Sequence, residues 1–135
     1  MSFEELSHTA DVSIRVRAPT LEVLFADAFA ALMETIFGKD RRGGSVKEIH
    51  IEAADSETLL MDFLSEVLFI CEVEGLVFSG ASVTTDGKTL TAVLNGEQFD
   101  HVRHAGGTEV KGISYSGLAI IRDENGYMLD ILFDV

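Results

Sequence analysis

The spacing of apolar residues alternates along this chain between a period of two and a period of three to four, and this constrains the fold more than any other feature. Val12 to Ala18 alternates between apolar and polar residues, which predicts a half-buried strand ended by Pro19. From Leu21 to Ile36 the apolar residues recur every three or four positions, which predicts a helix with Thr20 as N-cap and Gly38 at its end. The chain therefore starts as a strand followed by a helix.

The same two patterns follow a second time. Val46 to Ala53 alternates like a strand, and Leu60 to Cys71 forms one apolar helical stripe between a cap at Asp55 or Ser56 and a stop at Gly75. We expect the single cysteine on this stripe to be a buried hydrophobe rather than a reactive thiol. A second strand and a second helix are thus predicted.

Strand patterns fill the rest of the chain, apart from an irregular segment over residues 96–108. Two tight turns, Asp-Gly and Asn-Gly, tolerate the positive φ that a two-residue hairpin requires. The segments expected here are the strand Leu76 to Thr85, the turn Asp86-Gly87, the strand Lys88 to Asn95, the strand Val110 to Ile121, the turn Asn125-Gly126 and the strand Tyr127 to Val135.

This order predicts an α+β fold with two helices packed on one mostly antiparallel sheet. It allows two strand-helix-strand-strand modules, although no residue-level repeat supports them. A length of 135 residues suits a single domain over residues 1–135. With 47% hydrophobic and 24% charged residues, the chain has the composition of a globular protein with a real core.

The charge is strongly acidic. Ten Lys and Arg residues against 23 Asp and Glu residues give a net charge of −13, which repels nucleic-acid phosphates and favours divalent cations and basic partners. We therefore expect no direct nucleic-acid binding. One cysteine, no secretory signal and apolar runs of only about five residues indicate a cytoplasmic protein with no membrane segment.

The common catalytic motifs are missing. The sequence has no phosphate-binding G-x-x-x-x-G-K-[ST] loop, no G-x-S-x-G elbow and no H-E-x-x-H. The pair Gly106-Gly107 lacks the helix start that a phosphate cradle requires. His101 and His104 have a spacing that suits a metal, but no further ligands accompany them, so a structural or surface pair is favoured. Arg103 and His104 either cover a strand end or line a site.

The two ends of the chain carry the most informative polar residues. A cluster from Ser7 to Asp11, which contains His8, directly precedes the first strand, and Asp134 lies on the polar side of the last strand beside the α-carboxylate of Val135. If the sheet brings Asp11 to the same end, three carboxylates converge, and these suit a hard cation such as Ca²⁺, Mg²⁺ or Mn²⁺. From spacing alone, a simply solvated acidic pair is favoured over a metal site.

Five segments, spread in order over essentially the whole chain, together resemble the archease family. The opening His-Thr-Ala-Asp and the hydrophobic-Asp-aliphatic ending are the most specific of them. Two positions depart from the family's common pattern: Ser116 stands where His is frequent, and Phe63 stands where Trp is frequent, the latter a substitution expected in the core. The segments are His8-Thr9-Ala10-Asp11-Val12, Thr20-Leu21-Glu22, Leu64-Ser65-Glu66-Val67-Leu68, Glu109-Val110-Lys111-Gly112-Ile113-Ser114-Tyr115 and Leu132-Phe133-Asp134-Val135.

The resemblance implies two strand-helix-strand-strand modules, one inserted in the other. It also implies an accessory protein that is not itself an enzyme and that activates the RtcB-type RNA ligase in tRNA splicing. Such an activator promotes guanylylation of the ligase and multiple turnover, and broadens the NTPs that the ligase accepts. It is expected as a monomer or a weak homo-oligomer.

Residue by residue, the resemblance places the family's metal site on Asp11, Asp134 and Val135, with calcium as the first candidate cation and magnesium or manganese as alternatives. Lys111 is the next candidate, for contact with the ligase. His8, Arg103 and His104 complete the list of residues considered for that contact.

Two other classes of function stay open on the sequence. A stand-alone metal-dependent phosphohydrolase would use Asp11 and Asp134 as ligands and His8 or His104 as base, but the chain shows no clear nucleophile. A small-ligand-binding module would need an apolar pocket. The acidic helix from Asp55 to Glu74 either contacts the ligase or is simply solvated, and the solvated state is favoured.

Overall fold

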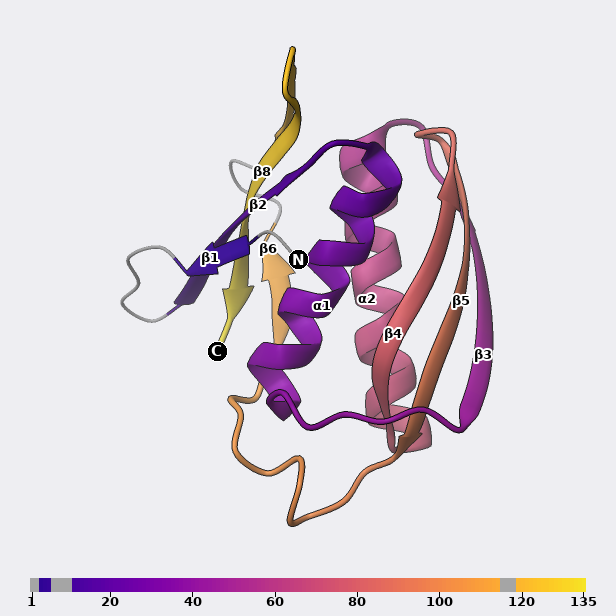
Figure 1. Cartoon of the computed structure of the whole chain (residues 1–135), viewed down its shortest axis with the longest axis vertical. Helices are drawn as coiled ribbons and strands as arrows, with labels where there is room; N and C mark the ends of the chain where they lie inside the picture. The colour runs from indigo at the N-terminus through magenta and orange to yellow at the C-terminus, as the bar shows by residue number, and fades with distance from the viewer. Residues whose placement is uncertain (1–2, 6–10, 115–118) are drawn as a thin grey trace.

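Two helices and eight strands make up the part of the chain that the computed structural model describes, residues 3–5, 11–114 and 119–135. The helices contact strands of two sheets, and Figure 1 shows them between the sheet that contains β8 and the sheet that contains β5. The predicted α+β class, two helices packed on antiparallel strands, is confirmed. The elements are β1 (Phe3–Glu5), β2 (Asp11–Ala18), α1 (Leu21–Phe37), β3 (Ser45–Glu52), α2 (Ser56–Glu74), β4 (Leu76–Thr85), β5 (Thr89–Gln98), β6 (Gly112–Ser114), β7 (Ile120–Asp123) and β8 (Gly126–Asp134).

The strands form two antiparallel sheets where the sequence suggested one. The larger has the order β1-β2-β8-β6, with β7 also pairing with β8, and the smaller has the order β3-β5-β4. The smaller sheet with α2 is a strand-helix-strand-strand module whose last strand lies in the middle. The larger sheet repeats this plan with β2, α1, β6 and β8, again with the last strand in the middle. One module is thus inserted in the other, between α1 and β6, as the resemblance implied.

Both helices begin and end at the predicted residues. The Thr20 hydroxyl accepts the Val23 N–H at 3.2 Å, and Asp55 rather than Ser56 caps α2, its Oδ1 accepting the Thr58 N–H at 2.7 Å. Gly75 ends α2 in the left-handed conformation, with φ of 65°, which glycine adopts without strain. Among the described elements, no helix combines the length and apolarity needed to cross a bilayer.

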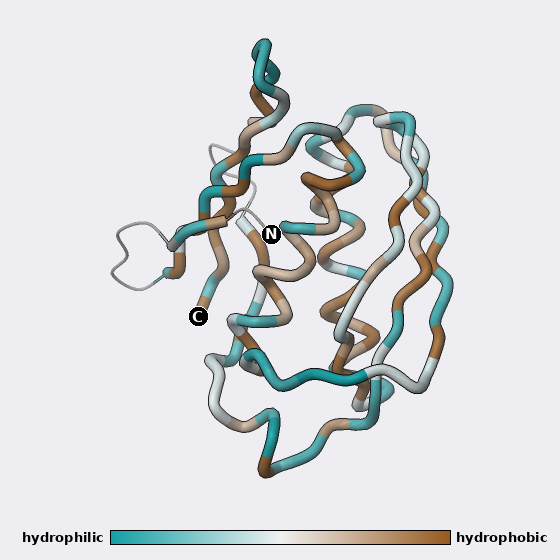
Figure 2. Tube along the Cα trace, in the orientation of Figure 1, coloured by the Kyte–Doolittle hydropathy of each residue, from teal (hydrophilic) through white to brown (hydrophobic). Residues whose placement is uncertain are grey.

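The core joins both modules. Phe63 is fully buried between Phe25 and Phe29, with ring centroids 6.4 and 6.3 Å away, which confirms it as a core residue. Cys71 is also buried, and burial raises the pKa of its thiol to about 12, as expected of a structural cysteine. Apolar and polar residues are interspersed along the smaller sheet (Figure 2), and on β5 the buried residues Leu90, Ala92 and Leu94 alternate with less buried ones and join the core.

Two strand predictions were wrong. The segment expected as one strand from Val110 to Ile121 contains two: from Ser114 to Ile120 the chain advances six residues, whereas their partners on β8, Leu132 and Leu129, are three apart. Residues 115–118, including Ser116, lie outside the described part. The second hairpin strand runs beyond Asn95 to Gln98, and β1 was not predicted at all.

Candidate functional site

The C-terminal end of β8 brings together several of the predicted site residues. Asp134, the last residue of β8, lies opposite Asp11 on β2 and opposite Gly112 on β6. The backbone N–H of Lys111 donates to the Asp134 carbonyl at 2.7 Å. Because β8 is the central strand, its end gathers Asp11, Lys111 and Asp134 at one corner of the larger sheet, with Val135 next along the chain.

Asp11 and Asp134 project from the same face of this sheet. Residues directly opposite each other in an antiparallel pair share a face, and along β8 Ile131 and Phe133 are buried while Asp134 is exposed. Two like charges in such positions destabilise a sheet unless something neutralises them. Unless a neighbouring group neutralises it, the Asp11–Asp134 pair would cost electrostatic free energy, which a bound cation or a basic partner would remove.

A neutralised pair lies on the same face. Arg15 faces Asp130 across the same two strands, and its guanidinium donates to both carboxylate oxygens, at 2.8 and 3.0 Å. Arg15 thereby holds the pKa of Asp130 below its usual range. On the same face of β2 and β8, one opposed pair thus consists of unlike charges and the other, Asp11 with Asp134, of like charges.

The carboxylate oxygens at the corner are of the chemical type that binds hard cations. Carboxylate oxygens are the ligands that Ca²⁺, Mg²⁺ and Mn²⁺ prefer, and Gly112 leaves the flank of Asp134 open, since a Cβ there would lie 3.8 Å from Asp134 Oδ2. Within the described ranges, no three His, Cys, Asp or Glu side chains gather closely enough to hold a metal ion. Asp11 and Asp134 alone would therefore need at least one further oxygen ligand to hold a metal ion. His8 lies outside the described residues.

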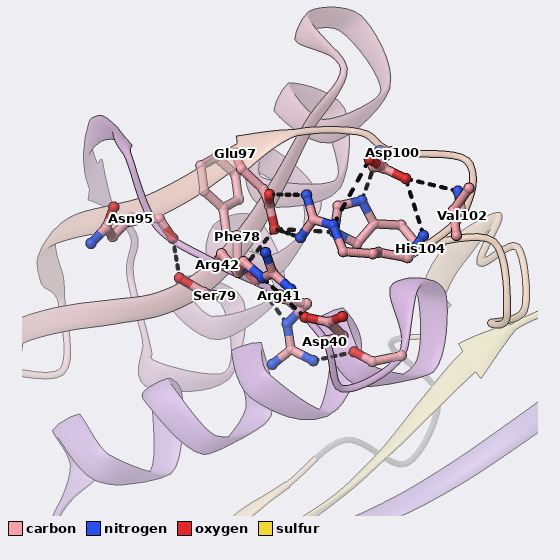
Figure 3. Close-up of polar contacts among 12 residues, drawn as sticks. Asp40, Arg41, Arg42, Phe78, Ser79, Asn95, Glu97, Asp100, Val102 and His104 are labelled. Atoms are coloured by element: carbon pink, nitrogen blue, oxygen red, sulfur yellow. Dashed lines mark hydrogen bonds and ion pairs between the residues drawn. The ribbon is translucent and has the colours of Figure 1, made fainter.

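Arg103 and His104 belong to a different cluster, centred on Glu97 near the end of β5 (Figure 3). The Arg103 guanidinium donates two hydrogen bonds to the Glu97 carboxylate, at 2.8 and 2.5 Å. The Arg42 backbone N–H donates to the same carboxylate at 2.7 Å. These contacts, above all those of Arg103, lower the pKa of Glu97 from 4.5 to about 2. Glu97 is thus held in its charged form.

His104 is a buried structural residue. Only 1% of its surface is exposed, its Nδ1 accepts the Asp100 N–H at 2.8 Å, and its Nε2 lies 3.2 Å from Glu97 Oε2. Since Nδ1 accepts a hydrogen bond, the proton of the ring belongs on Nε2, facing Glu97. The structure therefore agrees with the structural alternative for the His101 and His104 pair, and it does not bring Arg103 and His104 to Asp134.

The Glu97 cluster holds the segment that leads to the candidate site. Asp100 accepts the Val102 and Arg103 N–H groups at 2.8 and 3.2 Å, and further along Thr108 donates its N–H to the Thr35 carbonyl at 2.8 Å. A Cβ on Gly107 would collide with the Ile36 carbonyl, so this glycine is required for close packing against α1. Contacts with the Glu97 cluster and with α1 thus fix the path of residues 99–110, and this path places Lys111 beside the end of β8.

Glu97 was missed on the sequence because the second hairpin strand was expected to end too early. Leu90, Ala92 and Leu94 alternate as buried residues, and continuing this period through Gly96 would have placed Glu97 on the strand. Because Gly96 has no apolar side chain, the alternating pattern appeared to stop at Leu94. A Cβ at this position would collide with β4, so the glycine is a close contact within the sheet rather than a strand end.

A small cavity lies next to Lys111 along the chain. It has a volume of about 210 Å³ and is lined mainly by apolar side chains, with Glu72 and Glu109 also contributing. This volume is below the range of roughly 300–1,000 Å³ that small-molecule sites occupy. The cavity therefore gives little support to a small-ligand-binding module.

Two nested strand-helix-strand-strand modules define a class of small α+β proteins with known members. Residues 3–135 match the model of the archease protein family (MTH1598/TM1083). The chain belongs to the archease family. It is 34% identical to the protein archease of Methanopyrus kandleri over 140 residues, covering 100% of both chains. It is also 34% identical to that of Pyrococcus furiosus over 139 residues, covering 98% of each.

Solved structures share the fold. The solution structure of protein 1598 from Methanobacterium thermoautotrophicum superposes with a TM-score of 0.82 at 23% identity, covering 99% of both chains. The crystal structure of a Thermotoga maritima protein, described as an archease and possible chaperone, superposes with a TM-score of 0.70 at 18% identity, covering 98% of this chain and 96% of that one. These similarities show that the arrangement of the two modules is that of known proteins.

Proposed function

We propose that this protein is a cytoplasmic accessory factor that activates an RtcB-type RNA ligase in tRNA splicing, by presenting the Asp11–Asp134 corner to the ligase's nucleotide site. Membership of the archease family supports the role, and the observation that carries the site is the direct opposition of two carboxylates beside Lys111. The expected result is faster guanylylation of the ligase and repeated turnover, with a wider choice of NTP.

Asp11, Asp134 and the α-carboxylate of Val135 are the proposed ligands of a divalent cation, with calcium first and magnesium or manganese as alternatives. When bound, the cation would neutralise the opposed carboxylates and supply positive charge for nucleotide phosphates. Asp134 is exposed and Asp11 is half-buried, so both carboxylates lie where a partner surface can approach them. The two aspartates would hold this charge at a corner that the ligase can enclose.

Lys111 is the proposed contact to an acidic or phosphate group of the ligase complex. Its backbone is tied to Asp134, while its side chain is exposed. The Lys111 side chain is therefore accessible to a partner that binds at this corner. Since phosphoryl and nucleotidyl transfer depend on positioned positive charge, a lysine at this place complements the carboxylate pair.

The protein would reach the ligase rather than the RNA. A net charge of −13 repels RNA and attracts a ligase whose RNA-binding face is expected to be basic, which raises the rate of encounter more than the final affinity. An activator of this kind needs no chemistry of its own. We propose it as a monomer or a weak homo-oligomer that binds neither RNA nor membrane directly.

The test is guanylylation of the cognate ligase with GTP, followed over several turnovers. Asp11→Ala, Asp134→Ala and Lys111→Ala are compared with wild type and with Glu124→Ala, a control that removes an exposed acid in the turn between β7 and β8. Loss of activation in both Asp variants but not in the control is expected. Full activation by both Asp variants would refute the site. A chelator is a poor test, because the ligase itself needs metal.

The alternative of a stand-alone phosphohydrolase has weaker support. It requires a base beside the two aspartates, but His104 is buried and bonded to Asp100 and Glu97. The other base considered, His8, lies outside the described residues. Phosphoester turnover by the purified protein alone with Mg²⁺ or Mn²⁺ would revive this alternative.

A further inference from the structure

A long groove runs between α2 and β3, on elements that take no part in the Asp11–Asp134 corner. Its volume is about 510 Å³, and its walls come from one stripe of α2 and from consecutive residues of β3. The α2 stripe comprises Asp62, Glu66, Phe69, Ile70 and Glu74, whose spacing places them on one side of the helix. The β3 wall comprises Lys47, Glu48, Ile49, His50 and Ile51.

The groove follows the open edge of β3 rather than one of its faces. Successive residues of a strand point to opposite faces, and here both sets line the groove, including buried Ile49 and exposed Glu48 and His50. In the sheet order of the described strands, β3 has β5 as its neighbour on one side only. Figure 1 shows β3 as the outermost strand of the smaller sheet. Its backbone groups on the outer side are therefore available to pair with another strand.

Acidic side chains dominate the groove. Asp62, Glu66 and Glu48 carry negative charge along it, while the lone lysine, Lys47, is bonded to Glu74 at 2.8 and 3.0 Å. That ion pair joins β3 to the C-terminal end of α2 and neutralises one of the four carboxylates. Three carboxylates are left to meet an incoming positive charge.

Apolar surface accompanies the acids. Phe69 exposes 56% of its surface in the groove, although phenylalanine is usually among the most buried residues. On the same two elements, Val46 and Val73 expose 71% and 65%. Exposed apolar side chains with a polar rim are typical of protein-binding surfaces.

We propose that this groove docks an extended, basic segment of a partner protein, which adds to β3 as a further strand. The backbone edge of β3 supplies main-chain pairing, Phe69 supplies apolar contact, and the acids of α2 select Lys or Arg at alternate positions of the segment. A second copy of this chain is disfavoured, because edge pairing would bring two sets of the same acids together. The proposal is independent of the ligase-activating corner.

The probe is a fluorescent, acetylated peptide of alternating Lys and Val, about eight residues long to match β3. Its binding to the full chain is measured by fluorescence anisotropy and mapped by NMR amide shifts. Asp62→Asn with Glu66→Gln tests the groove, and Glu72→Gln with Glu124→Gln is a control that removes equal charge at exposed positions outside it. We expect the groove variant to bind about five- to tenfold more weakly and the control to bind nearly as wild type.

Two further peptides test strand pairing. They carry N-methyl groups on the odd or on the even residues, and because only alternate residues face the neighbouring strand, one should lose binding and the other retain it. Equal losses in the groove and control variants, tolerance of both methylation patterns, failure of the probe to bind, or equal binding of a Glu-Val peptide would each overturn the proposal. So would self-association of the chain in sedimentation that is accompanied by amide shifts at the groove residues. None of these readouts depends on ligase activation.

Discussion

Asp11 and Asp134 occupy directly opposite positions on β2 and β8. Two carboxylates therefore share one face of the larger sheet at the C-terminal end of β8. Four positions away on each strand, Arg15 and Asp130 form the complementary arrangement. The contrast means that the sheet can pair opposed charges of unlike sign, whereas Asp11 meets a like charge across the same two strands. The proposed binding of a cation or a basic partner at the corner would account for this arrangement.

Asp11→Asn should therefore change the response to cation more than the fold. Without added metal, removing the repulsion is expected to leave the free energy of unfolding equal or higher by up to about 1 kcal/mol. With CaCl₂, the melting temperature of wild type should rise, since a ligand that binds only the folded state stabilises it, and that of the variant should not. Thermal unfolding with and without CaCl₂ measures both effects. An equal rise in variant and wild type would contradict the assignment, and Glu124→Gln controls for lost charge.

Glu97 makes stability depend on pH. Arg103 and its neighbours lower the pKa of Glu97 to about 2 in the folded protein, from 4.5, so its charge stabilises the fold above about pH 4.5 and this contribution is lost as pH falls toward 2. Glu97→Gln should be less stable than wild type at pH 7, and the gap should narrow between pH 4.5 and 2. Urea unfolding at a series of pH values measures the gap. A gap that stays constant over this range would contradict the role of the ion pair.

The neighbours Gly106 and Gly107 should differ sharply. Gly107→Ala is expected to cost about 1–3 kcal/mol of stability, because its Cβ would collide with the Ile36 carbonyl backbone. Gly106→Ala is the matched control, since nothing lies within 4 Å of a Cβ there. Urea unfolding of the two variants compares them. Similar stabilities would show that residues 99–110 are not packed on α1 as described.

Lys111 offers a test that separates the contact with the ligase from the binding of metal. Lys111→Met should reduce ligase guanylylation about three- to tenfold, as loss of one charged contact allows, while the calcium-dependent rise in melting temperature stays as in wild type. The Lys111 backbone, not its side chain, is bonded to Asp134, so the corner itself should persist. Lys111→Arg, which keeps the charge, should retain most of the activation. Loss of the calcium response in Lys111→Met would instead indicate a role at the metal.

Local chemistry made much of the fold predictable. Thr20, Asp55 and Gly75 fulfil their predicted capping roles because a cap depends on residues three or four positions away. The division into two sheets was not predictable in this way, since strand pairing joins segments distant in sequence and no residue pattern records which edge meets which. The register that places Asp11 opposite Asp134 was unpredictable for the same reason, because it also depends on pairing between distant segments.

The site shows the same limit. Period-two alternation correctly placed Asp134 on the polar side of the last strand. Arg103 and His104 were considered together with Lys111 because they are close in sequence, but the segment between them is fastened to α1 and separates their environments. Their partner, Glu97, is one of 23 acidic residues in the chain, and only its contacts distinguish it from the others.

The central place of β8 sets an order of events during synthesis. The smaller sheet and α2 come from one continuous stretch, residues 45–98. Strands β3, β4 and β5, which pair with one another, therefore all emerge from the ribosome before β6. β2 emerges early but must wait for β8, which is made last and lies between β2 and β6. Since segments can fold as soon as their partners are available, the inserted module is able to form first. The corner that bears Asp134 then appears only when translation has passed through β8. A prematurely terminated chain would therefore carry the groove of α2 and β3 but not the corner proposed to activate the ligase.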